Sequence, residues 1–199
     1  MAVLVKKENL LFIGNNRTGS TAVGRALVSQ LGGKYVPEKV LHIDGVRISK
    51  RHATLDQLEK YGLIPDSKDL LKFVFVRNPY DSLVSYWKKN LLKPRFAHTS
   101  IARFQLQFST WVEEYLGSKP PKSMHARFVA GTDVVLRFES LSSDLDALFQ
   151  KVGIKSLEIP QTNVTKDREA DYRNYYSTEA RRIIKTMYFE DLERYGYTF

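Results

Sequence analysis

The octapeptide GNNRTGST follows a short apolar run and contains groups that could bind a multiply charged anion. Gly14 and Gly19 have the spacing of the glycines in a nucleoside-triphosphate loop, in which a Lys and then a Ser or Thr would come next. Here Ser20 and Thr21 occupy those two positions, and Arg17, inside the loop, is the long cation. A guanidinium carries a fork of hydrogen-bond donors that suits the oxygens of phosphate or sulfate. The pattern favours an anion site, and the alternative is a strand–turn–helix junction with polar caps.

The segments on either side of this loop are of the kind that would direct it toward a ligand. Residues 10–14 have the apolar character of a short buried strand, and residues 18–31 have the periodicity of a helix. The N–H groups at a helix start, and the positive end of the helix dipole, favour an anion. Gly19 would let the backbone approach that anion, and Ser20 and Thr21 would add hydroxyl donors.

A second strand ends in a cation. Residues 72–77, KFVFVR, have the character of a buried strand, and the NP dipeptide after them has the residue types of an N-cap and a first helical position. Ser85 falls nearly two turns into the helix predicted for residues 79–92. We expect Arg77 and Ser85 to bind one compact anion between them. A P-loop phosphoryl-transfer enzyme usually has an acid near such a strand end to hold Mg²⁺, so an Arg there indicates a second phosphate instead of a metal.

The rest of the chain alternates strands with helices. Such alternation predicts an α/β fold, a P-loop-like three-layer sandwich with a central, mostly parallel sheet flanked by helices. We expect one domain over residues 1–199, with ligands at the carboxyl ends of the strands. Further helices are predicted for residues 53–61, 101–116, 142–152 and 178–195, and further strands within residues 34–50 and at residues 133–138.

The composition is that of an ordinary soluble domain with an excess of positive charge. Lys and Arg number 31 against 22 Asp and Glu, a formal net charge of +9, which attracts anions such as nucleic acid, nucleotides or acidic glycans. The absence of Cys excludes disulfides and thiolate metal sites. No secretory signal is evident, and no stretch approaches the ~18 apolar residues of a membrane span. We therefore expect a soluble, cytoplasmic protein without a membrane partner.

These motifs resemble those of the sulfotransferase family, particularly its carbohydrate-type branch. The resemblance lies in RTGST after a strand, in VRNPYDSLVSYW, in VLRFESLSSDL and in the ending YYSTEARRIIKTMYFEDLERYGY. It implies transfer of a sulfuryl group from 3′-phosphoadenosine 5′-phosphosulfate (PAPS) to a hydroxyl group, here of a carbohydrate, which leaves 3′-phosphoadenosine 5′-phosphate (PAP). A metal is not expected, since no acid-rich or His-rich cluster has the character of a metal site.

The resemblance also implies site residues. The first motif would bind the 5′-phosphosulfate of PAPS through Asn16, Arg17, Thr18, Gly19, Ser20 and Thr21. Arg17 stands in place of the Lys of cytosolic relatives and would contact both the donor and the transition state. Arg77 and Ser85, eight residues apart as in the family, would bind the 3′-phosphate. Lys166 and Arg168 are weaker candidates at the 3′-phosphate, because the Arg-Lys-Gly run of cytosolic members is missing.

His52, in ISKRHATLDQL, is the candidate general base for the acceptor hydroxyl, since carbohydrate-type relatives often show a Lys-His or similar pair there. The alternative is a solvated surface His. The neighbouring cations Lys50, Arg51 and Arg17 would keep its imidazole neutral, as a base requires. His42 is the second candidate for the base, or else a strand His satisfied by its neighbours.

Residues 93–131 match no motif of the family, and the choice of acceptor is expected to depend on them. The aromatic stripe of the helix at residues 101–116 is interpreted as core in preference to a platform for sugars. His98 and His125 are expected at the surface.

Two rival interpretations remain open. A P-loop kinase for a small metabolite is disfavoured by Ser20 at the Lys position and by the lack of a metal-holding acid after KFVFV. A non-catalytic module that binds a nucleotide, a nucleic acid or an anionic glycan would keep the fold and the charge. Two separate phosphate contacts exceed what a basic patch needs, so nucleic acid is not expected as a partner.

Overall fold

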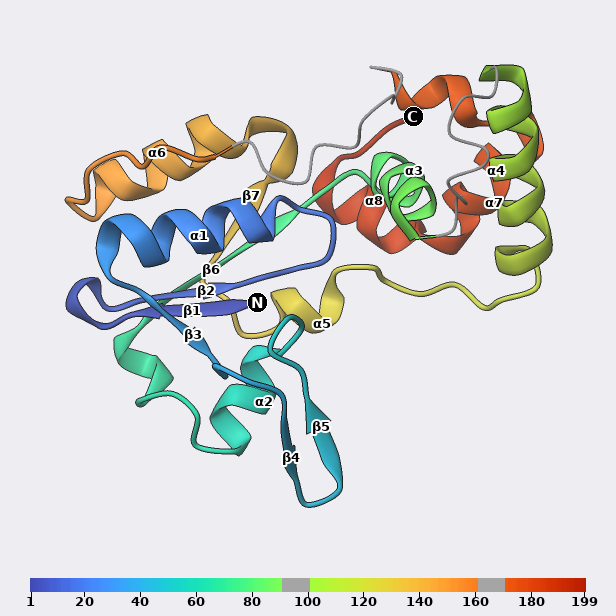
Figure 1. Ribbon diagram of the computed structural model, residues 1–199. Coiled ribbons are helices and arrows are strands. Elements are labelled where there is room, and N and C mark those ends of the chain that lie inside the picture. Colours follow the sequence, from blue (N-terminus) through green and yellow to red (C-terminus); the bar gives the residue numbers. More distant parts are fainter. Residues whose placement is uncertain (91–100, 161–170) are drawn as a thin grey trace. The chain divides into compact units, whose positions relative to one another are not determined.

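A five-stranded sheet forms from apolar segments of the chain, in the order β3-β1-β2-β6-β7 (Figure 1). Strand β1 runs antiparallel to β2 and β3, whereas β6 runs parallel to both β2 and β7. The predicted mostly parallel sheet is therefore confirmed, and β1, in an apolar patch for which no strand was expected, is its antiparallel member. The strands are β1 (Ala2–Val5), β2 (Leu10–Ile13), β3 (Lys34–Val36), β6 (Leu71–Val76) and β7 (Val134–Arg137).

The computed structural model describes residues 1–90, 101–160 and 171–199. The chain divides into a first unit, Met1–Arg77 with His125–Asn163, and a second unit, Asn78–Met124 with Val164–Phe199. The sheet belongs to the first unit, and the described part of the second unit is built from helices. The expectation of one domain over the whole chain stays a prediction.

Helices cover both faces of the sheet within the first unit. Helices α1 (Ser20–Leu31) and α6 (Leu141–Lys151) pack on one face, and α2 (Leu55–Lys60) and α5 (Ala126–Val129) pack on the other. Successive residues of a strand point to opposite faces, so a strand such as β2 contributes side chains to both clusters. The three-layer α/β arrangement predicted from the sequence is confirmed.

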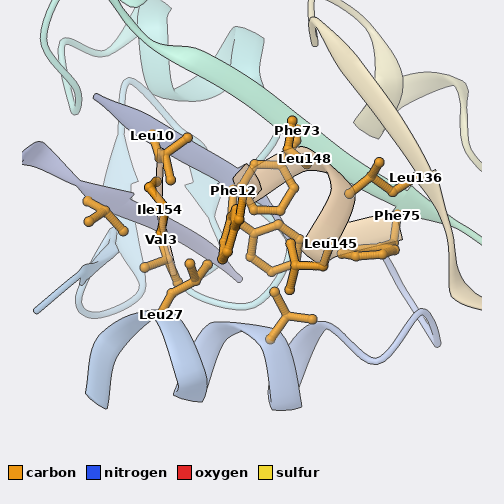
Figure 2. Close-up of a cluster of buried hydrophobic side chains, with 13 residues drawn as sticks. Val3, Leu10, Phe12, Leu27, Phe73, Phe75, Leu136, Leu145, Leu148 and Ile154 are labelled. Carbon is orange, nitrogen blue, oxygen red and sulfur yellow. The ribbon is translucent and has the colours of Figure 1, made fainter. Parts of the chain in front are cut away.

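The core under α1 and α6 is rich in phenylalanine (Figure 2). Phe12 of β2 and Phe73 of β6 have ring centres 5.1 Å apart, and Phe73 meets Phe149 of α6 edge to face at 6.3 Å. All three side chains are fully buried. Burial of one such side chain stabilises the fold by roughly 1.5–3 kcal/mol, so this cluster fixes β2 and β6 side by side.

A hairpin leads from β3 to the segment that holds His52. Strands β4 (Leu41–Ile43) and β5 (Val46–Ile48) pair antiparallel. Asp44 and Gly45, with φ of 50° and 74°, form the turn between them, as the favoured two-residue hairpin turn requires. Residues 34–50 thus contain three strands, against the one or two expected.

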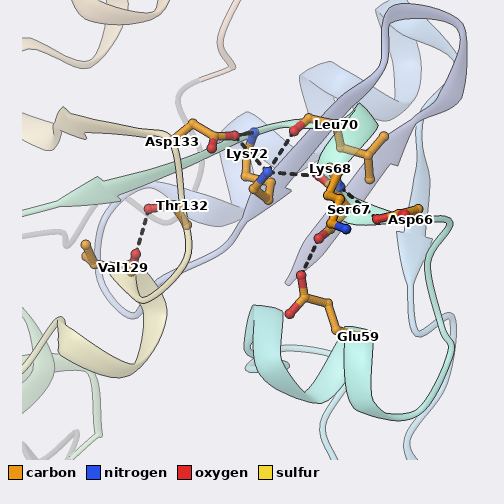
Figure 3. A network of polar contacts seen from close by, with 9 residues as sticks. All are labelled: Glu59, Asp66, Ser67, Lys68, Leu70, Lys72, Val129, Thr132 and Asp133. Carbon is orange, nitrogen blue, oxygen red and sulfur yellow. Dashed lines mark hydrogen bonds and ion pairs between the residues drawn. The ribbon is translucent and has the colours of Figure 1, made fainter.

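Lys72 holds the amino ends of β6 and β7 together (Figure 3). Its buried ammonium donates to the carbonyls of Ser67 and Leu70 at 2.9 and 3.0 Å and pairs with Asp133 at 3.0 Å. This network lies at the end of the sheet opposite to the strand ends at which ligands bind in such folds.

The second unit buries most of the aromatic stripe predicted as core. Phe104, Phe108 and Val112 of α4 are buried, which confirms that they belong to the core. Tyr115 is 55% exposed, so the prediction that it belongs to the core is wrong. The helix predicted for residues 178–195 is two helices, separated at Tyr188 by non-helical backbone. The helices are α3 (Pro79–Asn90), α4 (Ile101–Leu116), α7 (Thr178–Met187) and α8 (Phe189–Tyr195).

Short 3₁₀ segments complete the described elements, at Lys6–Glu8, Ser67–Asp69, Phe138–Ser140 and Tyr172–Tyr175. Over residues 1–90, 101–160 and 171–199, no helix combines the length and the apolar character that crossing a membrane would require.

Candidate active site

The loop of residues 14–19, between β2 and α1, turns at two residues in the left-handed region. Arg17 has φ of 59° and Gly19 has φ of 69°, a conformation that favours glycine. A methyl group on Gly19 would lie 2.8 Å from Leu141 Cδ1 and 3.2 Å from Phe138 Cε2. Gly19 then caps α1, because the N–H of Ala22 donates to its carbonyl at 2.8 Å. Backbone conformation and packing both explain the glycine at this position.

Polar groups inside the loop hold its shape. The N–H of Asn16 donates to Asn15 Oδ1 at 2.7 Å, and the hydroxyl of the buried Thr18 donates to Asn15 O at 3.1 Å. Ser20 and Thr21 are half-buried at the start of α1. Within the described parts of the chain, no acceptor contacts the N–H groups of these two residues. They are therefore donors at the positive end of the helix dipole.

Arg17 and Arg77 place two positive charges at the carboxyl ends of β2 and β6. Arg77 Nη1 donates to Arg17 O at 2.7 Å, and the guanidinium carbon of Arg77 lies 4.1 Å from the centre of the Phe138 ring. Burial lowers the pKa of Arg17, and the charge of Arg77 lowers it further. An Arg side chain is still protonated at neutral pH. Two such charges in a partly buried place attract a multiply charged anion.

His125 is fully buried, so the expectation that it lies at the surface is wrong. Its Nδ1 lies 2.8 Å from Asn15 Nδ2, and its Nε2 lies 2.8 Å from Arg77 O. His125 thus connects the end of β2 with the end of β6. A single His before the four-residue helix α5 carries no periodic signal, and its partners are far away in the sequence. Only the folded chain could identify it.

His52 lies between β5 and α2, at a turn that approaches the start of the loop. The N-terminal amine of Met1 contacts Arg51 O and donates to Gly14 O at 3.4 Å, so it connects the two segments. His52 itself is exposed. His52 directly follows Arg51, so it lies one residue from this contact.

The imidazole of His52 is held in its neutral form. Partial burial lowers its pKa to about 4, together with the positive charges of the N-terminal amine, Arg127, Arg51 and Arg47. Water still reaches the ring and screens these charges, but the direction is clear: the ring is neutral at pH 7. The sequence predicted such an effect from Lys50, Arg51 and Arg17. Of these, Arg51 lowers the pKa of His52 in the structure, and the other positive charges that lower it are those of Arg127, Arg47 and the N-terminal amine.

The remaining candidates lie in other elements or outside the described residues. His42 is exposed in β4. Ser85 is buried in α3, which belongs to the second unit, whereas Arg77 belongs to the first. A shared anion for Arg77 and Ser85 therefore stays a prediction. Lys166, Arg168 and His98 lie outside the described residues.

Among residues 1–90, 101–160 and 171–199, no three His, Cys, Asp or Glu side chains come together as a metal site would need. The guanidinium groups of Arg17 and Arg77 are of the kind that suits an anionic ligand.

Comparison with known proteins adds the family. A model of the sulfotransferase family matches residues 2–198, nearly the whole chain, whereas searches among curated proteins and among solved structures gave no match. The matched range includes the loop of residues 14–19, the end of β6 and the helices of the second unit. Because this match covers nearly the whole chain, the chain belongs to the sulfotransferase family.

Proposed function

We propose that the protein transfers the sulfuryl group of PAPS to a hydroxyl group of a carbohydrate. Membership of the sulfotransferase family supports sulfuryl transfer in general. The observation that carries the choice of donor is the pair of arginines at neighbouring strand ends, where the Arg77 guanidinium donates to the backbone carbonyl of Arg17. A nucleotide with a phosphosulfate on its 5′ side and a phosphate on its 3′ side offers one anionic group to each of these two arginines.

The loop of residues 14–19 and the start of α1 fit the 5′-phosphosulfate. The Arg17 guanidinium is the cation of the loop, and the N–H groups of Ser20 and Thr21 supply donors at the positive helix end. Gly19 presents no side chain to the ligand or to Leu141. Asn16 lines the same loop, while the hydroxyl of Thr18 holds the loop together, so Thr18 would contact the donor through its backbone.

Arg77 fits the 3′-phosphate. Its side chain is only 6% exposed and is held by the Phe138 ring and by Arg17 O, so little rotamer entropy is lost when it binds an anion. Ser85 would add a neutral hydroxyl donor from the second unit. A charge-assisted hydrogen bond is worth about twice a neutral one, so Arg77 would contribute more than Ser85.

His52 would act as the general base. Its neutral imidazole would take the proton of the acceptor hydroxyl while the acceptor oxygen forms a bond to sulfur. The bond between sulfur and the oxygen of the 5′-phosphate breaks, and PAP leaves with that electron pair. Arg17, next to the sulfuryl group, would stabilise the negative charge that develops on the bridging oxygen. The proton stays on the imidazole until product release.

Turnover with PAPS tests this proposal directly. The purified protein is incubated with PAPS, EDTA and a panel of glycans and small alcohols, and PAP release and acceptor mass are measured. We expect a glycan to gain the mass of a sulfuryl group as PAP is released. Phosphorylation of an acceptor with ATP and Mg²⁺, without any product from PAPS, would contradict the proposal in favour of a kinase.

A matched pair of histidine variants tests the base. His52→Ala should lower turnover by roughly 10²-fold or more, the usual scale for a lost general base, with PAP affinity unchanged. His42→Ala, which changes an exposed strand residue of the same hairpin region, should leave turnover near the wild-type value. The opposite result would assign the base to His42.

A further inference from the structure

A buried series of hydrogen bonds runs from the loop of residues 14–19 to Arg77. Its first member is the side-chain amide of Asn15, 1% exposed, whose Oδ1 accepts the N–H of Asn16 at 2.7 Å. This contact fixes which end of the amide is oxygen. The Nδ2 group therefore faces Phe75 O at 3.1 Å and His125 Nδ1 at 2.8 Å.

The orientation of Asn15 determines the tautomer of His125. An amide NH₂ group can only donate, so Nδ1 of His125 must accept, and the proton of the neutral imidazole is carried by Nε2. Nε2 lies 2.8 Å from Arg77 O, which can only accept, so the N–H donates there. The contact of Nε2 with the N of Arg77 is 3.5 Å, beyond an ordinary hydrogen bond. Both ring nitrogens are thus paired: Nδ1 with Asn15, which follows β2, and Nε2 with Arg77, which follows β6.

At Arg77, its last member, the same series of hydrogen bonds returns to the loop of residues 14–19. The guanidinium of Arg77 donates to Arg17 O at 2.7 Å and lies against Phe138, the ring that a methyl group on Gly19 would also meet. The backbone of Arg77 is therefore held by His125 and its side chain by the loop. An apolar residue at position 125 could fill the volume, but it would hold neither strand end in register.

We infer that His125 is a positioning residue that sets the distance between the loop of residues 14–19 and Arg77. The distance that His125 sets suits a nucleotide with phosphate groups on both its 5′ and its 3′ side. The inference rests on the proposed function. It concerns the carbonyl of Arg77, because the Nε2–H bond holds the backbone of this residue.

Two conservative variants separate the two bonds of the ring. In His125→Gln, the amide group ends at the distance of Nε2, so an N–H can still reach Arg77 O. In His125→Asn, the amide ends at the distance of Nδ1, so the contact with Asn15 is kept and the one with Arg77 is lost. A residue with a merely structural role would lower the stability in both variants and leave nucleotide preference unchanged.

The measurement is the ratio of the dissociation constants of 5′-AMP and PAP, by calorimetry on the full chain. We expect His125→Asn to lower this ratio about tenfold, the scale of one lost hydrogen bond, and His125→Gln to stay within about threefold of the wild type. Circular dichroism confirms that each variant is folded. If His125→Asn fails to fold, His125→Leu fills the volume of the ring with an apolar side chain, also lacks the Nε2–H bond to Arg77 O, and should lower the ratio in the same way.

Lys72→Met is the matched control. It also removes a buried polar side chain of the first unit, but from the amino end of the sheet, next to Ser67 and Asp133 (Figure 3). It should lower the melting temperature and leave the ratio unchanged. A wild type that binds PAP no tighter than 5′-AMP would overturn the proposed donor and this inference together. A wild type that prefers PAP, with an unchanged ratio in His125→Asn or in its substitute His125→Leu, would overturn the inference alone.

Discussion

Two glycines at opposite ends of helix α1 allow the packing of the loop to be measured separately from its backbone conformation. Gly19, before the helix, has φ of 69°, and Gly32, after it, has φ of 67°. A methyl group on Gly19 would meet Leu141 at 2.8 Å and Phe138 at 3.2 Å, whereas a methyl group on Gly32 has no atom within 4 Å. Gly32→Ala therefore measures the cost of the left-handed conformation, and Gly19→Ala adds the cost of the contact.

The expected magnitudes follow from these distances. A left-handed Ala costs roughly 1–2 kcal/mol, and the stiffer unfolded chain offsets ~0.4–1 kcal/mol of it, which leaves about 1 kcal/mol for Gly32→Ala. Overpacking against Leu141 and Phe138 adds ~1–3 kcal/mol for Gly19→Ala. For a chain of this size, 1 kcal/mol corresponds to ~2–4 °C in Tm. We thus expect a fall of ~2–4 °C for Gly32→Ala and of ~4–16 °C for Gly19→Ala.

The assay combines thermal melting with PAP titration. Gly19→Ala should weaken PAP binding about tenfold or more, because a displaced loop disturbs at least one charge-assisted hydrogen bond, worth ~1.5–3 kcal/mol. Gly32→Ala should bind PAP as the wild type does, since α1 separates it from the loop. Equal Tm and equal PAP affinity in the two variants would refute the packing argument for Gly19.

Three further predictions concern polar side chains of the proposed site. Arg77→Ala should weaken the binding of PAP by about 10- to 150-fold, since a charge-assisted hydrogen bond is worth ~1.5–3 kcal/mol. The binding of 5′-AMP should be nearly unaffected. Equal losses of affinity in a titration of both nucleotides would place the 3′-phosphate elsewhere. Ser85→Ala should cost PAP affinity on the order of 1 kcal/mol in the same titration, and no loss would remove Ser85 from the site. The pKa of His52, lowered to about 4 by burial and neighbouring positive charges, keeps the base neutral as pH falls. The pH profile of kcat/KM should therefore show no loss of a base with a midpoint near 6.5, and such a midpoint would exclude His52.

The layers of the fold could be predicted from local sequence patterns. β2 and residues 73–76 of β6 are continuous apolar runs, as is typical of strands buried on both faces. Gly32 ends α1 as a glycine after the last helical turn does. β1 could not be predicted in the same way, because four apolar residues do not reveal an antiparallel partner. The break at Tyr188 has no proline or glycine to mark it.

The candidate site was predictable where a motif lies in consecutive residues. The loop of residues 14–19 and Arg77 follow directly from strand ends and residue types. His125 and Asn15 could not be found, because their contact joins positions 110 residues apart and involves no spacing pattern. The contact of His125 with Asn15 and with Arg77 is thus a property of the fold.

The preference for PAP over 5′-AMP tests the central claim most directly. The wild-type protein is titrated with each nucleotide by calorimetry in buffer that contains EDTA, followed by ATP with and without Mg²⁺. We predict that PAP binds at least about tenfold tighter than 5′-AMP without any metal, because Arg77 adds a charge-assisted contact with the 3′-phosphate. Equal affinities for PAP and 5′-AMP, or ATP that requires Mg²⁺ and binds tighter than PAP, would contradict a PAPS-dependent sulfotransferase.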